Sequence, residues 1–535
     1  MNRIALGLGA ALLATTALTA AAQAGDIVRV ATVPLEAEIT GMYITEAGDF
    51  FFNVQHPGDG NPAPYNMAAV GAITGTDFNA LPKMIKEHGV PSGDAKGKIL
   101  SSLGSYQIIG SEGGLREHFP AGLGAILAVD GKTVVKESND PDFNAFVPTT
   151  ADSSEGYLFT NWEDRPGGTS RMHIAKGADG KWMVKKDGNM MVDFSSVNGT
   201  WVNCFGSLSP WGTPLTSEEL YFDNTADWNN PGYKRHKDQL KLADYLGHFP
   251  NPYDYGYIVE LKDPKGEVVP QKRFAMGRYS HENAVVMPDR KTAYLSDDGT
   301  GVVFFKFVAD QAGDLSSGTL YAAKVTQDAG TKDPAKAGFD ISWIELGHGD
   351  DATIESWVRQ YDGITPIHYK QGSSSYLSDA EINAWAMGKA DDNRAVFLET
   401  RKAAAAKGAT AEFRKMEGVM INQAGAANGT VPYMYMAMSA IGKTMSDDKG
   451  DVQLNANKCG VVYQMNLDKG FNVHRMVPVV AGHGYNKANK PNACPTDSIS
   501  NPDNLLVLND GRVLIGEDTG SHENNMLWIY TPKSP

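Results

Sequence analysis

The sequence has 535 residues, of which 42% are hydrophobic and 21% are charged, so the chain can bury a sizeable core. Lys and Arg total 48 against 63 Asp and Glu, which gives a formal net charge of −15. A chain this acidic repels nucleic acids and anionic membrane surfaces, and neither is expected as a partner. After the first 25 residues the sequence has no apolar run long enough to cross a bilayer, which predicts no membrane span.

The first 24 residues have the features of a signal peptide. Arg3 supplies the positive start, residues 4–18 are apolar, small or Thr, and Ala22-Gln23-Ala24 is a cleavage motif. No twin-arginine pair is present, which favours the general secretory route. We therefore expect a mature chain of residues 25–535 that is periplasmic or secreted.

The three cysteines fit an exported protein with one disulfide. Cys459 and Cys494 lie in the same C-terminal region, and we expect them to form the disulfide. Cys204 is then a lone thiol in an oxidising compartment. Such a thiol is either buried and inert or bound to a metal, and composition does not decide between the two.

A strand–turn–strand pattern recurs along the chain. Residues 282–299 and 503–520 match closely: each has a polar residue, an apolar strand, a short Asp/Gly turn, a second apolar strand and an acidic end. Residues 40–56 and 417–438 follow the same form, and residues 204–219 and 106–114 fit it less well. Six hairpins at blade-like spacing predict an all-β fold, a six-bladed β-propeller in a single domain.

One stretch, at about residues 350–410, departs from the β pattern. Ser378 and Glu381 form a capping box at the start of an apolar helical segment, and an alanine run, residues 403–406, continues the helical composition. We expect a partly helical insertion between two blades.

The repeats themselves predict where the chemistry takes place. In a propeller the innermost strands line a central channel, so the equivalent starting residues Thr40, Cys204, Glu282, Glu417 and Asp503 would converge there. Three carboxylates beside a thiol repel one another strongly unless a cation neutralises them. A buried metal cluster is the simplest solution, and thiolate favours a transition metal while carboxylates suit iron or calcium. The alternative is that these residues lie in solvated turns and are unrelated.

Known catalytic signatures of other enzyme classes are missing from the sequence. It contains no G-x-S-x-G elbow, Walker loop or G-x-G-x-x-G fingerprint, and His281-Glu282 does not continue into the H-E-x-x-H motif of zincins. These absences argue against an elbow-type serine hydrolase and against a nucleotide-cofactor enzyme.

Several motifs together resemble the PhoX-type alkaline phosphatases. Residues 199–219, GTWVNCFGSLSPWGTPLTSEE, are similar to the family's run around its cysteine, and residues 255–282 resemble its YGWVVE…HE segment. Residues 52–58, 294–298 and 501–504 also match family motifs. The resemblance covers nearly the whole mature chain.

This resemblance implies a metal-dependent phosphomonoesterase on a six-bladed propeller, with Fe³⁺ and Ca²⁺ in the channel and a small-molecule phosphate ester as substrate. Of the Glu218–Glu219 pair, Glu219 is the preferred ligand, and Glu112 matches the family's N-H-E motif weakly. The candidate metal ligands are Cys204, Glu112, Glu218, Glu219, Glu282, Asp298, Glu417 and Asp503. The candidate catalytic residues are Lys415, Arg414 and His281. We expect a monomer.

The chain departs from the family pattern at two of these positions. Lys415 stands where the family has the arginine of its R-P-E motif, and Gly110-Ser111 replaces the Asn-His before Glu112. A lysine cannot make the bidentate contact of an arginine with phosphate. These changes leave an alternative open, namely a non-enzymatic, calcium-stabilised propeller that binds a ligand or partner. A calcium-dependent hydrolase of the lactonase kind is a further alternative.

Overall fold

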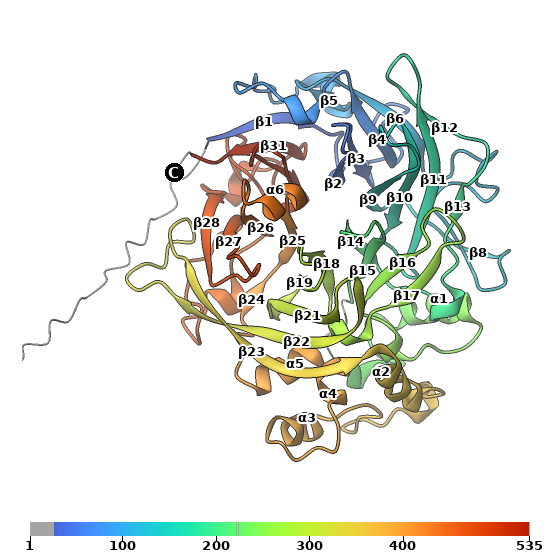
Figure 1. The fold of residues 1–535 in the computed structure, drawn as a ribbon, viewed down its shortest axis with the longest axis vertical. Coiled ribbons are helices and arrows are strands. Elements are labelled where there is room, and N and C mark those ends of the chain that lie inside the picture. The colour runs from blue at the N-terminus through green and yellow to red at the C-terminus, as the bar shows by residue number, and fades with distance from the viewer. Residues whose placement is uncertain (1–25, 221, 223, 534–535) are drawn as a thin grey trace, which may run out of the picture.

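The computed structural model describes residues 26–220, 222 and 224–533. The predicted signal peptide, residues 1–24, lies outside the described residues. As the sequence predicts, the described chain is predominantly β, and its sheets are arranged around a common centre (Figure 1). Among the described residues, no helix is both long and apolar enough to pass through a membrane.

Three sheets follow one another from the N-terminal part of the chain. The first contains β2 (Glu38–Ile44), β3 (Phe50–Gln55), β4 (Ala69–Thr74) and β6 (Ser105–Ser111). The second contains β9 (Pro141–Pro148), β10 (Glu155–Trp162), β11 (Gly168–Lys176), β12 (Trp182–Val184) and β13 (Met190–Met191). The third contains β14 (Asn203–Leu208), β15 (Pro214–Glu218), β16 (Ile258–Lys262) and β17 (Val269–Lys272).

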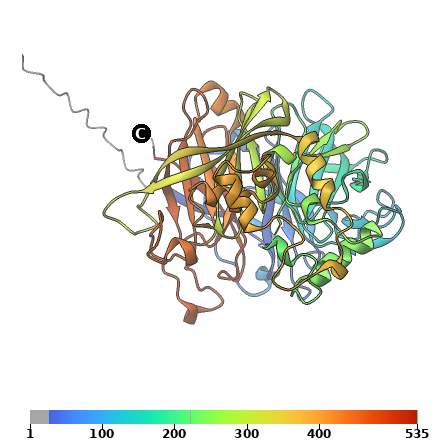
Figure 2. The same cartoon turned by 90° about the horizontal axis from the view of Figure 1, so that it is seen from below.

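The next sheet has nine strands because two antiparallel units join at their outer edges. One unit contains β18 (His281–Val286), β19 (Thr292–Asp297), β21 (Phe305–Gln311), β22 (Asp314–Gln327) and β23 (Phe339–Asp350). The other contains β25 (Met416–Ile421), β26 (Tyr433–Met438), β27 (Val461–Asn466) and β28 (Arg475–Ala481). Only two residue pairs of β23 and β28 make the junction, Phe339 with Met476 and Asp340 with Arg475. Figure 2 shows the long β22–β23 pair running across the side of the molecule.

The remaining large sheet joins the two ends of the chain. It contains β29 (Pro502–Val507), β30 (Val513–Glu517), β31 (Met526–Thr531), β1 (Asp26–Thr32) and β5 (Leu100–Ser101). Strand β1 pairs with β31 from Asp26–Thr531 to Thr32–Met526, so N- and C-terminal segments share one sheet (Figure 1). Two smaller pairs complete the strands, β7 (Ala125–Leu127) with β8 (Val134–Glu137) and β20 (Thr300–Val302) with β24 (Phe413–Arg414).

Six strands from these sheets surround the centre. Strands β2, β9, β14, β18, β25 and β29 contact one another in that order, and β29 contacts β2 again. Each is followed by an antiparallel neighbour, and sharp turns connect the pairs. At the turn between β18 and β19, for example, the Asp289 carboxylate accepts hydrogen bonds from the backbone N–H groups of Lys291 and Thr292. One correction concerns residues 106–114. Residues 106–111 belong to β6, the outer strand of its sheet, and the sixth central strand is β9.

The expected helical insertion is present. Helices α2 (Asp351–Val358), α3 (Asp379–Ala386), α4 (Arg394–Leu398) and α5 (Thr400–Ala406) lie between β23 and β24 at the periphery (Figure 1). The predicted capping box begins α3, since Ser378 Oγ accepts from Glu381 N and the Glu381 carboxylate accepts from Ser378 N. Two further helices, α1 (His236–Leu246) and α6 (Gln423–Asn428), lie outside the insertion.

The predicted disulfide between Cys459 and Cys494 is confirmed, and Cys204 is a free, buried thiol. The disulfide ties the segment before β27 to the segment before β29. Because the two strands lie in different sheets, the bond restrains one sheet relative to the next.

Candidate metal centre

The same irregularity occurs in all six central strands. In β25, Met416 pairs with Met438 and Val419 pairs with Met436, so two residues, Glu417 and Gly418, face a single residue of β26. This is a β-bulge, which redirects side chains at its position. The first bulge residues of β2, β9, β14, β18, β25 and β29 are Gly41, Asp142, Cys204, Glu282, Glu417 and Asp503.

Five of these six residues carry a thiol or a carboxylate, and the sixth is a glycine. The repeat pattern predicts Thr40 at this position, and that prediction is wrong by one residue. In the structure, Thr40 Oγ1 donates a hydrogen bond to the Pro141 carbonyl. Gly41 has φ +60, and a Cβ there would lie 2.3 Å from Asn53 Nδ2 and 2.5 Å from the Asp142 carbonyl. Only glycine fits this corner of the ring.

The bulge residues and their neighbours form three groups that could hold metal ions. The groups are Asp142, Cys204 and Glu282; Glu163, Cys204 and Glu219; and Glu282, Glu417 and Asp503. Within each group one potential ligand atom per residue lies within 4.8 Å of the others. Cys204 and Glu282 each belong to two groups, so the three groups form one continuous cluster.

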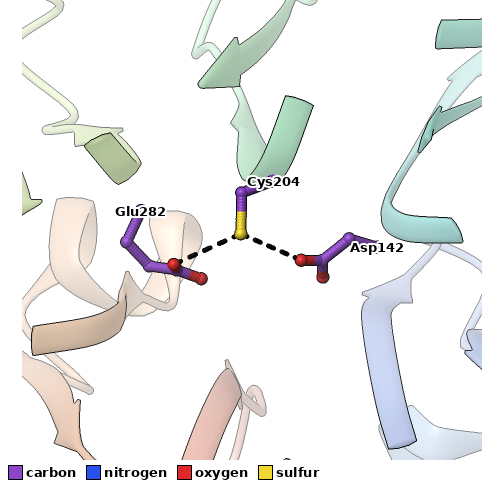
Figure 3. A group of neighbouring side chains, drawn as sticks. All are labelled: Asp142, Cys204 and Glu282. Atoms are coloured by element: carbon purple, nitrogen blue, oxygen red, sulfur yellow. Dashed lines mark hydrogen bonds between the residues drawn. The ribbon is translucent and has the colours of Figure 1, made fainter. Parts of the chain in front are cut away.

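The thiol of Cys204 lies between two carboxylates (Figure 3). Its Sγ is 3.0 Å from Asp142 Oδ2 and 3.3 Å from Glu282 Oε2. A thiol has one hydrogen and can donate to only one of them at a time. Glu282 Oε1 and Asp503 Oδ1 are buried and have no hydrogen-bond partner among the described residues. A cation would satisfy these oxygens, so the residues fit a metal cluster.

The pKa values of the cluster also indicate that its acidic groups lack a neutralising charge. Burial, strengthened by Asp503, Glu417 and Glu219, raises the pKa of Glu282 well above its ordinary value. Burial raises the pKa of Asp142 to about 7 and that of Glu417 to about 7. Burial and the adjacent Asp142 also raise the pKa of the Cys204 thiol. Without a metal these groups hold protons at any pH below their raised pKa values, and metal binding must release those protons.

A second set of acids lies where the neighbouring strands end. Glu163 follows β10, Glu219 follows β15, Asp298 follows β19 and Asp518 follows β30. Burial, then Asp298 and Glu163, raise the pKa of Glu219 well above its ordinary value. The ammonium of Lys415 lies here, 2.5 Å from Asp298 Oδ2 and 3.2 Å from Glu417 Oε1.

Glu218 does not join the cluster, although it is adjacent to Glu219. Its carboxylate is fully buried and accepts hydrogen bonds from the backbone N–H groups of Trp201, Gly256 and Tyr257. Its Oε1 also lies 3.0 Å from Lys272 Nζ. The structure therefore favours Glu219 as the ligand of the pair.

Two more candidates lie outside the three groups. Glu112 follows β6, is half-buried and accepts a hydrogen bond from Ala68 N at 3.3 Å. Arg414 is on β24, where its backbone pairs with Thr300.

His281 is adjacent to Glu282 but has a different environment. It is fully buried, its ring stacks on Tyr279 at a centroid distance of 3.7 Å, and its Nε2 lies 2.9 Å from the Gly277 carbonyl. Burial lowers the pKa of His281 to about 3. The imidazole is therefore neutral at neutral and alkaline pH, and its contacts support the segment that leads into β18.

Sequence reasoning missed Asp142 and Glu163. Both belong to the hairpin β9–β10, which has the general form of the other hairpins: Asp142 near its start, apolar strands, a turn at residues 149–154 and the acidic Glu163 at its end. That pattern is a usable signal, whereas the prediction above assigns the sixth hairpin to residues 106–114.

A cavity lies away from these groups. It has a volume of about 850 Å³ and is lined by the later parts of the central strands, including Ile44, Val147, Leu208 and Val507. The acidic groups are at the beginnings of the same strands. The centre of the ring of six strands therefore has two chemically different sides, one acidic and one largely uncharged.

Comparison with known proteins identifies the family. The family model described as alkaline phosphatase PhoX matches residues 139–533, which include every residue of the three groups. The chain belongs to the PhoX family of alkaline phosphatases. This PhoX family member is a phosphomonoesterase, as its sequence motifs imply. A comparison with curated protein sequences found no match.

Solved structures include one with a related fold. Pseudomonas fluorescens PhoX, in complex with vanadate described as a transition state analogue, matches with a TM-score of 0.55 and 17% identity. The match covers 94% of this chain and 89% of that one. The calcium structure of a Trichoderma reesei carbohydrate-active enzyme of family AA12 gives a TM-score of 0.38 at 9% identity, covering 96% and 97% of the two chains.

Proposed function

We propose that this phosphatase hydrolyses small-molecule phosphate esters at a cluster of Fe³⁺ and Ca²⁺ ions held by the bulge residues of its central strands. The carrying observation is the buried Cys204 thiol between Asp142 and Glu282, beside carboxylate oxygens that have no hydrogen-bond partner. Family membership and the chemistry of the donors support the same proposal.

The donor sets differ in the metal that they suit. The two groups that contain Cys204 combine a thiolate with carboxylates, which is a transition-metal environment and suits iron. The group of Glu282, Glu417 and Asp503 offers only carboxylate oxygens, which suits calcium. Because Glu282 belongs to both kinds of group, its carboxylate would help to hold both ions.

The ions would supply Lewis-acid stabilisation of the negative charge that develops on the phosphoryl group. The chain's own residues would hold the ions in place: the buried carboxylates bind them at the centre, and the bulges fix the carboxylates. Substrate would approach from the side where Asp518 is exposed and Lys415 keeps 31% of its side chain accessible. The assignment of a phosphate contact to Lys415 or Arg414 stays a prediction.

For the scaffold we propose a six-bladed β-propeller, with the β22–β23 extension linking two blades. The closed ring of six central strands and the β1–β31 pairing between the two ends of the chain support this proposal. Residues 25–535 would form a single domain, with β1 completing the last blade.

We propose that the enzyme is exported to the periplasm or beyond and acts as a monomer. The Cys459–Cys494 disulfide supports an oxidising compartment. The net charge of −15 argues against nucleic acid as a partner. The non-enzymatic alternative loses its basis, because the chain belongs to a phosphatase family.

Elemental analysis and a p-nitrophenyl phosphate assay test this function together. We expect iron and calcium in the purified mature protein and turnover that requires calcium. Cys204→Ser should lose the iron and at least about 100-fold of the activity, since losing a ligand costs no less than losing a supporting contact.

As a control, Glu117→Gln changes an exposed carboxylate with 71% of its side chain accessible and should leave both readouts unchanged. Circular dichroism should show both variants folded. Full iron content and turnover in Cys204→Ser would rule out the thiolate as a ligand.

A further inference from the structure

Lys415 is a cation that lies among the carboxylates at the acidic side of the ring of central strands. Its ammonium is 2.5 Å from Asp298 Oδ2 and 3.2 Å from Glu417 Oε1. Glu219 is a third carboxylate whose charge acts on the same ammonium, beside those of Glu417 and Asp298. Three acids from three different sheets or sheet units thus converge on one nitrogen.

The backbone holds this side chain in place. Lys415 N donates to the Gly299 carbonyl at 2.8 Å, directly after Asp298, and Ser439 N donates to the Lys415 carbonyl at 3.1 Å. Lys415 also has φ +53, a left-handed conformation that a lysine adopts only where its surroundings impose it. The β20–β24 pairing brings residues 300 and 414 together and so delivers Lys415 to Asp298.

Asp298 is fully buried and comes from a position equivalent to those of Glu163 and Glu219, yet it belongs to none of the three metal-binding groups found among the described residues. Its carboxylate already has a cation, the Lys415 ammonium. A bound ammonium and a bound divalent ion exclude each other at such a site, because both need the same carboxylate oxygens.

We propose that Lys415 is a resident cation of the cluster and fills the place between Asp298, Glu417 and Glu219 that a Ca²⁺ ion would otherwise occupy. This inference rests on the proposed metal-dependent function and concerns how many ions the cluster takes. The lysine in place of the family's arginine then has a role other than gripping phosphate. Its ammonium is a compact point charge, which fits among three carboxylates.

The test counts metal ions in Lys415→Met, which keeps a long, unbranched side chain without the charge. Wild type and variant are stripped with a chelator, dialysed against the same free Ca²⁺ and iron, and analysed for bound metals. We expect the variant to bind about one more Ca²⁺ per chain than wild type, with Asp298 as a new ligand. Lys415→Arg, which keeps the charge, should show the wild-type count.

The double variant Lys415→Met with Asp298→Asn should lose the additional ion again. Equal calcium counts in wild type and folded Lys415→Met would overturn the proposal. Weaker inhibition of that variant by inorganic phosphate would then make Lys415 a phosphate contact. If Lys415→Met does not fold without metal, its refolding on added Ca²⁺ alone supports the resident-cation role, and failure to refold contradicts it. Absence of iron and calcium from wild type would instead contradict the proposed function.

Discussion

Without its metal ions, the protein should become progressively less stable as the pH rises from about 4 to about 7. The lower limit is the ordinary pKa of a carboxyl group, and the upper limit is the pKa of buried Asp142 and Glu417. In the folded, metal-free chain these groups hold their protons, while in the unfolded chain they ionise at their ordinary values. The contribution to stability is therefore complete below the unfolded pKa and is lost as the pH passes through the folded pKa.

The expected effect is large. For Asp142 the shift from 3.8 to about 7 corresponds to about 4 kcal/mol of folding free energy above neutral pH. Glu282, Glu219 and Asp503, whose pKa values burial and neighbouring acids raise well above normal, extend the loss to higher pH. The groups titrate as a cluster, so their contributions do not add.

Metal ions should reverse this trend, because they bind the ionised carboxylates and displace the protons. Chemical unfolding of chelated and metal-loaded protein at a series of pH values between 5 and 8 measures both slopes. We expect the difference in unfolding free energy between the two forms to grow with pH. A chelated form whose stability does not fall over this range would contradict a buried acidic cluster.

Asp142→Asn provides the matched control. Asparagine keeps the shape of Asp142 but cannot ionise, so the chelated variant should be more stable than chelated wild type at pH 8, and this difference should shrink as the pH falls toward 4. The same variant should bind metal more weakly. A single substitution that stabilises the metal-free form and weakens metal binding is the signature of a ligand selected for function.

Much of the centre follows from the sequence because four candidate ligand positions lie in recurring hairpin patterns, which are strong at Glu282 and Asp503 and weaker at Cys204. Cys204, Glu282, Glu417 and Asp503 each begin an apolar strand, and the repeat places them together without knowledge of the fold. The bulge explains the error at Thr40. An extra residue in the strand moves the inward position by one, and hydrophobic alternation does not reveal this shift.

Other features depend on tertiary contacts that sequence patterns do not encode. The junction of β23 with β28 consists of two residue pairs, so no pattern predicts a nine-stranded sheet. The different roles of Glu218 and Glu219 depend on Lys272, which pairs with Glu218 and lies 54 residues later in the sequence. The ring position of Asp142 depends on which of two weak hairpins, β9–β10 or the one ending in β6, faces the centre.

The adjacent acids Glu218 and Glu219 should give opposite results when each is changed to glutamine. Glu218→Gln should lower the unfolding free energy by about 3–5 kcal/mol, because it leaves the buried Lys272 ammonium without its partner charge. Lys272 keeps only 1% of its side chain accessible, so water cannot replace that partner. Since Glu218 points away from the three metal-binding groups, iron and calcium contents should stay at wild-type values.

Glu219→Gln should behave in the reverse way. It removes a carboxylate that lies with Glu163 and Cys204 in a possible metal site, so metal affinity should fall by at least about 100-fold. The chelated variant should nevertheless be more stable than chelated wild type at pH 8, because burial, Asp298 and Glu163 all disfavour the ionised Glu219. Chemical unfolding in chelator and metal analysis after reloading measure the two effects separately. Two neighbouring residues of the same type are thus each other's control. If both variants lost similar amounts of metal, or similar amounts of stability, the assignment of Glu218 to a structural ion pair and of Glu219 to a metal site would be contradicted.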